Sequence, residues 1–276
     1  MRQLPVYVVN MTSRADRRAL MERTQDRLGV NFTFIPAVDG RNPDAIVDEG
    51  IPTGRVTGRP RSRIDFAVVS SHRLCWKRII DDDEPFGIVL EDDVVLSDDF
   101  ARFTTTGWIP AGADIVKLET MLRYVEIHDL EWNAMIGRKI GRLESVHLGA
   151  AGYLITRDAA RRLWNATTVP FDQIDHILFT KSIWNELGLK VVQVDPAPVV
   201  QGMLHRDHAS ADWAASSLQG HRLEHGMSMT MEAHRQVGGS GGLTFRKVAR
   251  LKSVLHVGRF IRSFVNGGAY RRVQFK

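Results

Sequence analysis

The chain has 276 residues, of which 43% are hydrophobic and 25% charged, and this ordinary globular composition excludes wholesale disorder and fibrous repeats. It contains no run of about 20 apolar residues, the length that a membrane-spanning helix needs, and its first residues lack the apolar core of a secretory signal peptide. A single cysteine, Cys75, excludes an intramolecular disulfide and a cysteine-based zinc site. We therefore expect a cytoplasmic protein.

The net charge of +5 is concentrated at one end of the chain. Residues 243–276 hold nine Lys and Arg and no acidic residue, whereas the other 242 residues carry 28 basic and 32 acidic groups. The glycine-rich stretch 238–242 is typical of a flexible linker. We therefore divide the chain into a body at 1–237, a linker at 238–242 and a basic C-terminal helical arm at 243–276.

The arm contains two short basic amphipathic segments. Such segments bind anionic membrane surfaces, so the expected partner is the inner face of the cytoplasmic membrane, with the protein held there peripherally. A C-terminal helix docked on the body is the alternative. Nucleic acid is not expected as a partner, because the arm carries no recognisable binding module and the body is acidic.

In the body, apolar runs alternate with amphipathic stretches, and this order of strand, helix and strand predicts an α/β sheet. The first helix is expected to begin near Ser13, in capping-box spacing with Asp16, and to end at Gly29. A second helix is expected over residues 66–80, after a long polar loop at 41–63. The expected strands cover residues 6–10, 32–38, 86–90, 115–118, 153–155 and 190–194.

Three consecutive carboxylates, Glu91, Asp92 and Asp93, directly follow the apolar strand expected at 86–90. Like charges this close raise one another's pKa or require a cation, and ligand sites in open α/β sheets lie at the carboxyl ends of strands. Since alternate residues of an extended segment point the same way, Glu91 and Asp93 are expected to share one face. An all-oxygen pair suits Mg²⁺ or Mn²⁺ that also holds phosphate oxygens, and a solvated acidic turn is the structural alternative.

Seven short segments between about residues 4 and 201 occur in an order that resembles glycosyltransferase family 25, the family of bacterial lipooligosaccharide galactosyltransferases and collagen galactosyltransferases. They are Val6–Asn10 with Arg14, Asp16, Arg17 and Arg18; Ala37–Gly40; Ser71 and His72 with Trp76; Val89–Val94; Gly152–Thr156 with Ala159 and Ala160; Pro170–Asp172; and Pro198–Gln201. The sequence departs from the family before Ser71, where Asp65–Ser70 replaces the usual Glu-x-Gly-Cys.

The resemblance implies a GT-A-like single nucleotide-sugar-binding domain with a mixed, mostly parallel central sheet. It also implies an inverting, Mn²⁺- or Mg²⁺-dependent transferase that moves a hexose, galactose from a UDP-galactose donor, onto a lipooligosaccharide, LPS or other cell-envelope saccharide acceptor, expected to be lipid-linked. A metal-dependent phosphohydrolase that acts on a nucleotide or a phosphorylated sugar is the alternative function. It requires a second carboxylate cluster, and none is evident on a later strand end.

The resemblance also assigns roles to individual residues. The metal ligands are expected to be Asp93, Glu91 and His205. The donor is expected to contact Asn10, Arg14, Arg17, Asp39, His72, Glu91 and Asp92. The base that deprotonates the acceptor hydroxyl is expected to be Asp172 or Asp175.

Several of these residues have a purely structural alternative. Arg17 fits an exposed helix arginine, Asp39 a simple Asp-Gly turn, Asp172 a helix cap, His205 a surface histidine and His72 a packing residue. Four arginines of the polar loop form a further group that is expected to meet an anionic acceptor, a hypothesis from charge alone. They are Arg55, Arg59, Arg61 and Arg63.

Overall fold

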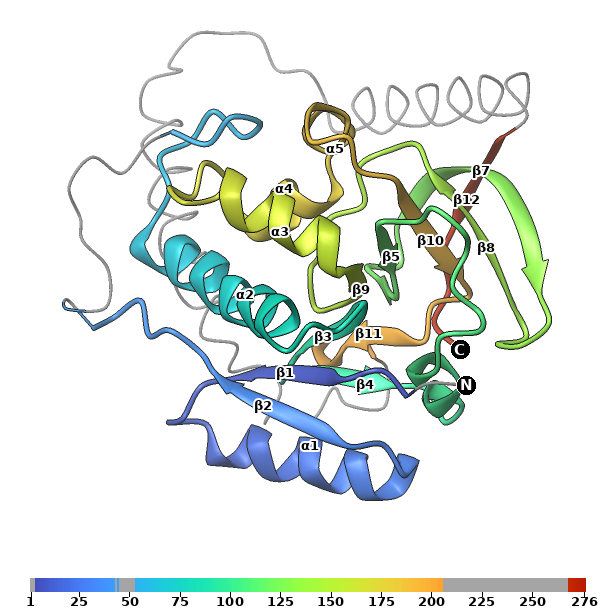
Figure 1. The fold of residues 1–276 in the computed structure, drawn as a ribbon, viewed down its shortest axis with the longest axis horizontal. Helices are drawn as coiled ribbons and strands as arrows, with labels where there is room; N and C mark the ends of the chain where they lie inside the picture. Colours follow the sequence, from blue (N-terminus) through green and yellow to red (C-terminus); the bar gives the residue numbers. More distant parts are fainter. Residues whose placement is uncertain (1–2, 43, 45–52, 206–267) are drawn as a thin grey trace, which may run out of the picture.

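A computed structural model describes residues 3–42, 44, 53–205 and 268–276 of the chain. Its larger sheet is built from β1 (Val6–Asn10), β2 (Phe32–Pro36), β3 (Phe86–Glu91), β5 (Ile115–Lys117), β7 (Tyr124–Asn133), β8 (Arg138–Leu143), β9 (Gly152–Thr156), β10 (Val191–Asp195) and β12 (Gly268–Arg272). These nine strands lie in the order β12-β7-β8-β10-β5-β9-β3-β1-β2 (Figure 1). A smaller sheet has the order β4-β11-β6, with β4 at Val94–Leu96, β11 at Val199–Gln201 and β6 at Glu119–Thr120.

The helices are α1 (Ala15–Leu28), α2 (Arg63–Asp81), α3 (Arg157–Ala166), α4 (Ile174–Phe179) and α5 (Lys181–Glu186), with short 3₁₀ turns at Phe100–Thr104 and Gly202–Leu204. In Figure 1, α1 lies on one side of strands β1–β3, and α2, α3 and α4 lie on the other. This is the mixed α/β architecture that the alternating sequence predicts, and it is confirmed.

The expectation of a mostly parallel sheet is wrong. Among the described strands of the larger sheet, three neighbouring pairs are parallel and five are antiparallel. The parallel pairs need long crossovers, such as α1 between β1 and β2, whereas β7 and β8 are joined by a short hairpin connection that only antiparallel strands allow. Two of the three parallel pairs, β1–β2 and β1–β3, form the N-terminal end of the sheet, where the carboxylates lie, and the third is β5–β10.

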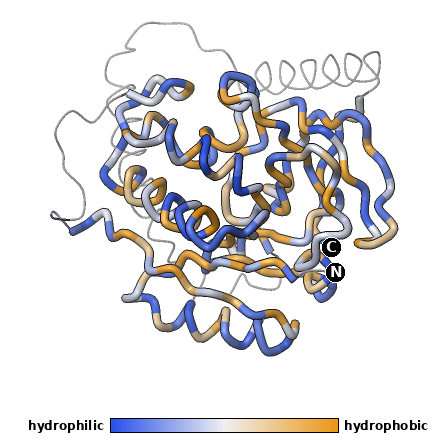
Figure 2. Tube along the Cα trace, viewed as in Figure 1, coloured by the Kyte–Doolittle hydropathy of each residue, from blue (hydrophilic) through white to orange (hydrophobic). Residues whose placement is uncertain are grey.

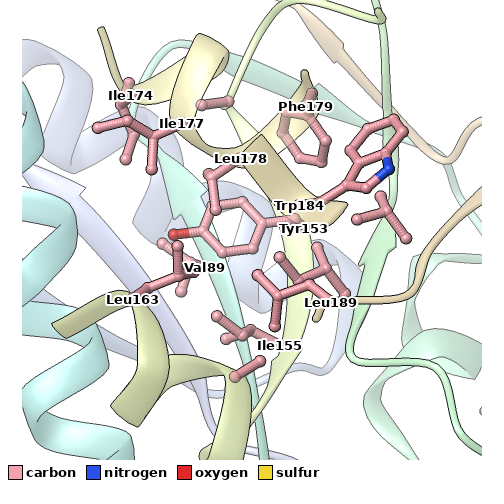
Figure 3. Close-up of a cluster of buried hydrophobic side chains, with 14 of the residues drawn as sticks. Val89, Tyr153, Ile155, Leu163, Ile174, Ile177, Leu178, Phe179, Trp184 and Leu189 are labelled. Atoms are coloured by element: carbon pink, nitrogen blue, oxygen red, sulfur yellow. The ribbon is translucent and has the colours of Figure 1, made fainter. Parts of the chain in front are cut away.

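The central strands are buried on both faces. Tyr7 and Val9 of β1 belong to a core cluster beneath α2–α4, and Val6 and Val8 belong to a second cluster beside α1. Figure 2 shows the apolar colouring of these strands, and Figure 3 shows Tyr153 within the first cluster. Such two-sided burial explains why the strands appear in the sequence as unbroken apolar runs.

Capping differs from the expectation at both predicted helices. Helix α1 has Arg14 at its N-cap with no side-chain capping bond, so the predicted role of Ser13 is wrong. A complete capping box instead starts α2, where Ser62 and Asp65 bond each other's backbone N–H groups. This helix therefore begins three residues earlier than the expected range of 66–80.

The end of the chain returns to the body. Strand β12 pairs antiparallel with β7, Val273 is fully buried, and the Arg271 guanidinium lies 2.7 Å from the carboxylate of buried Asp195. Residues 268–276, expected as part of a helical arm, thus contain an edge strand of the large sheet. The linker 238–242 and residues 243–267 lie outside the described residues. Among the helices that the structure describes, none is long and apolar enough to cross a membrane.

Candidate functional site

The carboxylates lie where two parallel strands end side by side. Strand β1 ends at Asn10 and β3 at Glu91, with Val9 opposite Glu91 in the register. The Asn10 amide donates a hydrogen bond of 2.7 Å to Asp92, which is buried in the turn between β3 and β4. The sequence therefore places the acidic segment correctly at the carboxyl edge of the parallel strands, where ligands bind in open α/β sheets.

One arginine joins the two aspartates of this turn. Arg17, in the first turn of α1, places Nη1 at 2.8 Å from Asp92 and at 3.4 Å from Asp93. Its side chain is only 11% exposed, so it is not the exposed helix arginine of the structural alternative. Glu91 has a different neighbour, because its Oε1 lies 3.4 Å from Nε2 of His72. Strand β3 ends at Glu91, so the alternation of side chains along the strand does not determine the neighbours of Asp93, two residues later.

Asp93 holds a strongly perturbed carboxylate. Burial, with the nearby charge of Glu91, raises the pKa of Asp93 to about 7, although Arg17 acts to lower it. Its Oδ1 is buried and has no hydrogen-bond partner among the described residues. A buried acceptor oxygen with a raised pKa is a place where an added cation is favourable.

The donor set at this turn fits a hard divalent cation only in part. Glu91 and Asp93 supply carboxylate oxygens, but no group of three His, Cys, Asp or Glu side chains within the described ranges is arranged to hold a metal ion. Mg²⁺ is commonly held by one or two carboxylates together with phosphate oxygens of a substrate. The pair therefore suits a cation that arrives with a diphosphate.

His205, the third expected ligand, lies near the turn through its backbone. Gly202 N–H donates to the Asp93 carbonyl at 2.7 Å, and His205 N–H donates to the Gly202 carbonyl at 3.1 Å. The ring of His205 packs edge-on against Phe275, with centroids 5.3 Å apart. His205 lines a cavity of about 480 Å³ between α1 and β4, and Arg23 also lines this cavity.

His72 lies at the centre of a buried chain of polar groups. Its Nδ1 is 3.0 Å from the hydroxyl of Tyr153, and Trp76 Nε1 donates to the same hydroxyl at 2.9 Å. Burial lowers the pKa of His72 to about 4, so the imidazole is neutral at physiological pH. His72 therefore faces the carboxylate Glu91 as a neutral ring.

Sequence reasoning missed a buried ion pair beside the site. Lys117, at the end of β5, and Glu119, on β6, have no solvent exposure, and Nζ lies 3.4 Å from Oε2. Lys117 also donates to the Gly149 carbonyl, and Glu119 accepts from Ala151 N–H at 2.9 Å. Burial raises the pKa of Glu119 to about 7 and lowers that of Lys117. The available signal was a Lys and a Glu within a run that is otherwise apolar.

This pair is linked to Glu91 through one loop. Ala151, whose N–H bonds Glu119, accepts at its carbonyl from the backbone N–H of Glu91 at 3.0 Å. Gly149 adopts φ +93°, and a Cβ there would lie 2.7 Å from Glu119 Oε1. Only glycine suits both the backbone conformation and this close approach. The loop thus connects the buried pair to the end of β3 through the two hydrogen bonds of Ala151.

The two expected base residues occupy different surroundings. Asp172 is fully buried and accepts hydrogen bonds from Val56 N–H at 2.7 Å and Gln173 N–H at 2.8 Å, so it anchors the preceding loop. Asp175, at the start of α4, is half-buried, with Oδ2 3.5 Å from Gly149 N. Its charge acts to raise the pKa of both His72 and Lys117, although burial is the larger influence on each.

The other residues expected to contact the nucleotide-sugar donor form hydrogen bonds with residues close to them in the sequence. Arg14 bonds Asp16 at 2.9 and 2.7 Å, and its pKa is raised mainly by that bond, with smaller contributions from the charges of the carboxylate turn. Asp39 accepts from the backbone N–H and the side chain of Arg41, which lowers the pKa of Asp39. The structure therefore brings together Asn10, Arg17, His72, Glu91, Asp92 and Asp93, whereas the side chain of Asp39 turns to its own loop.

The arginines of the polar loop hold that loop to the body. Arg55 pairs with Glu186 at 2.9 Å and lies over the ring of Phe171. Arg61 is buried and lies over the ring of Phe66. These contacts do not test the anionic-acceptor hypothesis for Arg55, Arg59, Arg61 and Arg63, which stays a prediction from charge.

The family now follows from comparison with known sequences. The sequence profile described as Glycosyltransferase family 25 (LPS biosynthesis protein) matches residues 3–178. The chain belongs to glycosyltransferase family 25. The resemblance seen in the sequence is therefore confirmed, and with it the assignment as a glycosyltransferase.

Individual members of family 25 align over most of the chain. Two lacto-N-neotetraose biosynthesis glycosyltransferases of Neisseria meningitidis serogroup B are similar: LgtE, 31% identical over 79% of this chain and 80% of its own length, and LgtB, 29% identical over 83% and 86%. Procollagen galactosyltransferase 1-B of Xenopus laevis is 27% identical over 75% of this chain and 36% of its own length. Among solved structures, a glycosyltransferase involved in glycosylation of the major capsid of PBCV-1 covers 77% of this chain and 96% of its own, with a TM-score of 0.42 and 10% identity.

Proposed function

We propose that this family 25 glycosyltransferase transfers galactose from UDP-galactose to a lipooligosaccharide or LPS acceptor, with inversion at the transferred sugar. The observation that carries the proposal is the carboxylate turn at the paired ends of β1 and β3, where Asn10, Arg17, Glu91, Asp92 and Asp93 meet. The sugar and acceptor are suggested by relatives named for procollagen galactosylation and lipooligosaccharide biosynthesis.

In this proposal Asn10 and Arg17 bind and orient the donor. Asn10 already fixes Asp92, and Arg17 holds Asp92 and Asp93 on one side of the turn. A guanidinium at this place also suits a phosphate or uracil oxygen of the incoming nucleotide, because its several N–H groups bind more than one acceptor at once.

Glu91 and Asp93 are the residues that would hold Mn²⁺ or Mg²⁺. Support comes from the unpartnered, buried Oδ1 of Asp93 and from the raised pKa that a nearby cation would relieve. Such an ion, when bound, neutralises the charge that develops on the departing diphosphate. His205 is a weaker third ligand, since its ring lies against Phe275.

Asp175 is the better placed of the two carboxylates to act as the base. Asp172 is buried, and its two carboxylate oxygens accept hydrogen bonds from the backbone N–H groups of Val56 and Gln173. Asp175 also accepts two backbone N–H groups, from Gly149 at 3.5 Å and from His176 at 3.0 Å, but its side chain is only half-buried. A base must be able to reach the acceptor hydroxyl, and the partial exposure of Asp175 allows this where the burial of Asp172 does not.

Calorimetric titration tests the donor and the metal together. UDP-galactose, UDP-glucose and UDP-N-acetylglucosamine are titrated with and without Mn²⁺ into the wild type, Asp93→Asn and Asp98→Asn. Asp98 is the matched control, because it carries the same carboxylate five residues later with a side chain that is 97% exposed. Mn²⁺-dependent binding of UDP-galactose that Asp93→Asn loses and Asp98→Asn keeps is expected. Equal binding by all three proteins contradicts the metal assignment, and preference for another sugar contradicts the donor assignment.

We further propose that residues 243–267 hold the enzyme peripherally at the inner face of the cytoplasmic membrane. Six Lys and Arg occur in this stretch without an acidic residue, and each basic residue near an anionic surface contributes about 1 kcal/mol. Flotation with vesicles containing phosphatidylglycerol, compared with neutral vesicles, tests it. A variant with the six residues changed to Gln is expected to lose flotation, and flotation that survives the change contradicts the proposal.

The phosphohydrolase alternative has no support from the comparisons. The named relatives are transferases or biosynthesis proteins. Glu119, the buried carboxylate beside the turn, is already bonded to Lys117 and to the Ala151 N–H.

A further inference from the structure

The buried chain Trp76–Tyr153–His72 fixes the direction of its hydrogen bonds. The indole N–H of Trp76 can only donate, so the Tyr153 oxygen accepts from it at 2.9 Å. The hydroxyl proton of Tyr153 then points to its other partner, Nδ1 of His72, at 3.0 Å. All three side chains are buried to at least 98% of their surface, so water does not compete for these bonds.

This direction determines which nitrogen of His72 carries the proton. A neutral imidazole that accepts at Nδ1 must carry its hydrogen on Nε2. Nε2 is buried and lies 3.4 Å from Oε1 of Glu91, but no hydrogen bond of good geometry forms there among the described residues. The ring therefore presents one unused N–H, 3.4 Å from an oxygen of the carboxylate that ends β3.

We propose that His72 is a positioning residue for Glu91: Trp76 and Tyr153 lock its Nε2–H tautomer, and this N–H holds the Glu91 carboxylate in the orientation that receives the donor. The proposal rests on the proposed role of Glu91 in the donor site. Hydrogen bonds at active sites are often long in the free enzyme and tighten when the substrate binds, which a separation of 3.4 Å permits.

The neutral N–H of His72 affects Glu91 differently from a cation. It orients one oxygen of Glu91 without neutralising the carboxylate, so the charge remains available to the metal or to the sugar. Histidines that ligate metals are oriented by a second partner in the same way, but here the histidine itself is the partner of the carboxylate.

The tautomer is measured directly, and this measurement does not depend on activity. Protein labelled with ¹⁵N in its histidine rings is examined by long-range ¹H–¹⁵N correlation, and the signals of His72 are assigned by their loss in His72→Gln. A protonated Nε2 and an unprotonated Nδ1 are expected in the wild type. Tyr153→Phe removes the lock and is expected to give a mixture of tautomers. A protonated Nδ1 in the wild type overturns the proposal, whether or not the donor assignment holds.

Kinetics then separate positioning from packing. His72→Leu removes the N–H and is expected to lower kcat/KM for the donor by about 10- to 100-fold, as loss of such outer partners does. His72→Gln places an amide N–H where Nε2 lies and is expected to recover most of the activity. Ile79→Val is the control for stability, because it removes a buried methyl group from the same helix without touching His72.

The outcomes are distinct. If His72→Leu and His72→Gln lose activity equally at matched folded fractions, the N–H has no role and the proposal is wrong. If Ile79→Val loses donor affinity as His72→Leu does, the effect is one of stability and the proposal is also wrong. If the enzyme binds none of the UDP-sugars, the proposed function fails, while the tautomer measurement still decides the hydrogen-bond chain.

Discussion

The buried Lys117–Glu119 pair allows a quantitative prediction. Lys117→Met keeps an unbranched side chain that is one atom shorter and removes the ammonium group, so it leaves Glu119 without its cation at zero exposure. Breaking a buried ion pair from one side costs about 3–5 kcal/mol, because the remaining charge must stay in the core or take up a proton. The Gly149 carbonyl also loses its donor, which adds to the loss.

For Lys117→Met we also expect a specific dependence of the free energy of unfolding on pH. Burial raises the pKa of Glu119 from 4.5 to about 7 even with Lys117 present, and Lys117 is the largest influence that lowers it. In the variant, between about pH 5.5 and 7.5, the folded state therefore keeps the proton on Glu119 while the unfolded state has lost it. Since the unfolded state binds one proton fewer, the free energy of unfolding of the variant falls by about 1.4 kcal/mol per pH unit across this range; in the wild type the fall ends near pH 7, where Glu119 ionises beside Lys117, so the variant departs from the wild type above that pH.

Urea denaturation followed by tryptophan fluorescence measures both quantities. The wild type, Lys117→Met, Glu119→Gln and the double variant are compared at about pH 5.5, 6.5 and 7.5. The double variant carries no charge at this place, so it is expected to be more stable than Lys117→Met at the highest pH and to lack the pH dependence that Glu119 causes. A loss below about 1 kcal/mol in Lys117→Met, or a loss that does not grow with pH, refutes the reasoning.

Three further predictions concern the residues of the site. Arg17→Met leaves Asp92 and Asp93 without their shared cation, so we expect a lower melting temperature that Mn²⁺ raises more in the variant than in the wild type; an equal response to Mn²⁺ in a thermal melt contradicts this. Asp175→Asn is expected to lower kcat by about 100-fold or more with unchanged donor affinity, as loss of a general base does. Asp172→Asn is expected to cost about 1–3 kcal/mol of stability in a urea melt instead, because its carboxylate satisfies buried backbone N–H groups. A larger loss of kcat in Asp172→Asn than in Asp175→Asn reverses the two roles.

The elements that sequence predicts well are those in which burial covers whole strands. The runs 6–10 and 86–90 became β1 and β3, and the carboxylates that follow them lie at the expected edge. An unbroken apolar run followed by charge is a strong signal because few other structures bury it. The same logic explains why the order of strand and helix was correct in the first third of the chain.

The hairpin of β7 and β8 was missed for a local reason. Val125 and Ile127 are buried and alternate with half-exposed residues, as a half-buried strand should. The alternation then breaks at Asp129, which has φ +51°, and the register shifts between His128 and Glu131. An irregularity of this kind depends on pairing with the partner strand, and a short alternating pattern alone does not reveal it.

The polar partners within the core were also beyond a reading of single segments. Lys117 meets Gly149, and His72 meets Tyr153, over separations of 32 and 81 residues. Such contacts arise only when the sheet brings β5, β9 and α2 together. Local composition can mark these residues as unusual, but their partners follow from topology.

The return of the chain in β12 has a practical consequence for any attempt to remove the basic residues. A stop codon before residue 243 would delete β12 as well. Strand β7 would then be the outermost strand, and its edge from Tyr124 to His128 would have no pairing partner. Exposed strand edges promote association between molecules, so such a truncated protein would report aggregation rather than the loss of basic charge. The informative deletion is internal: it joins the body to Gly268 through a neutral linker and leaves the edge of the sheet covered.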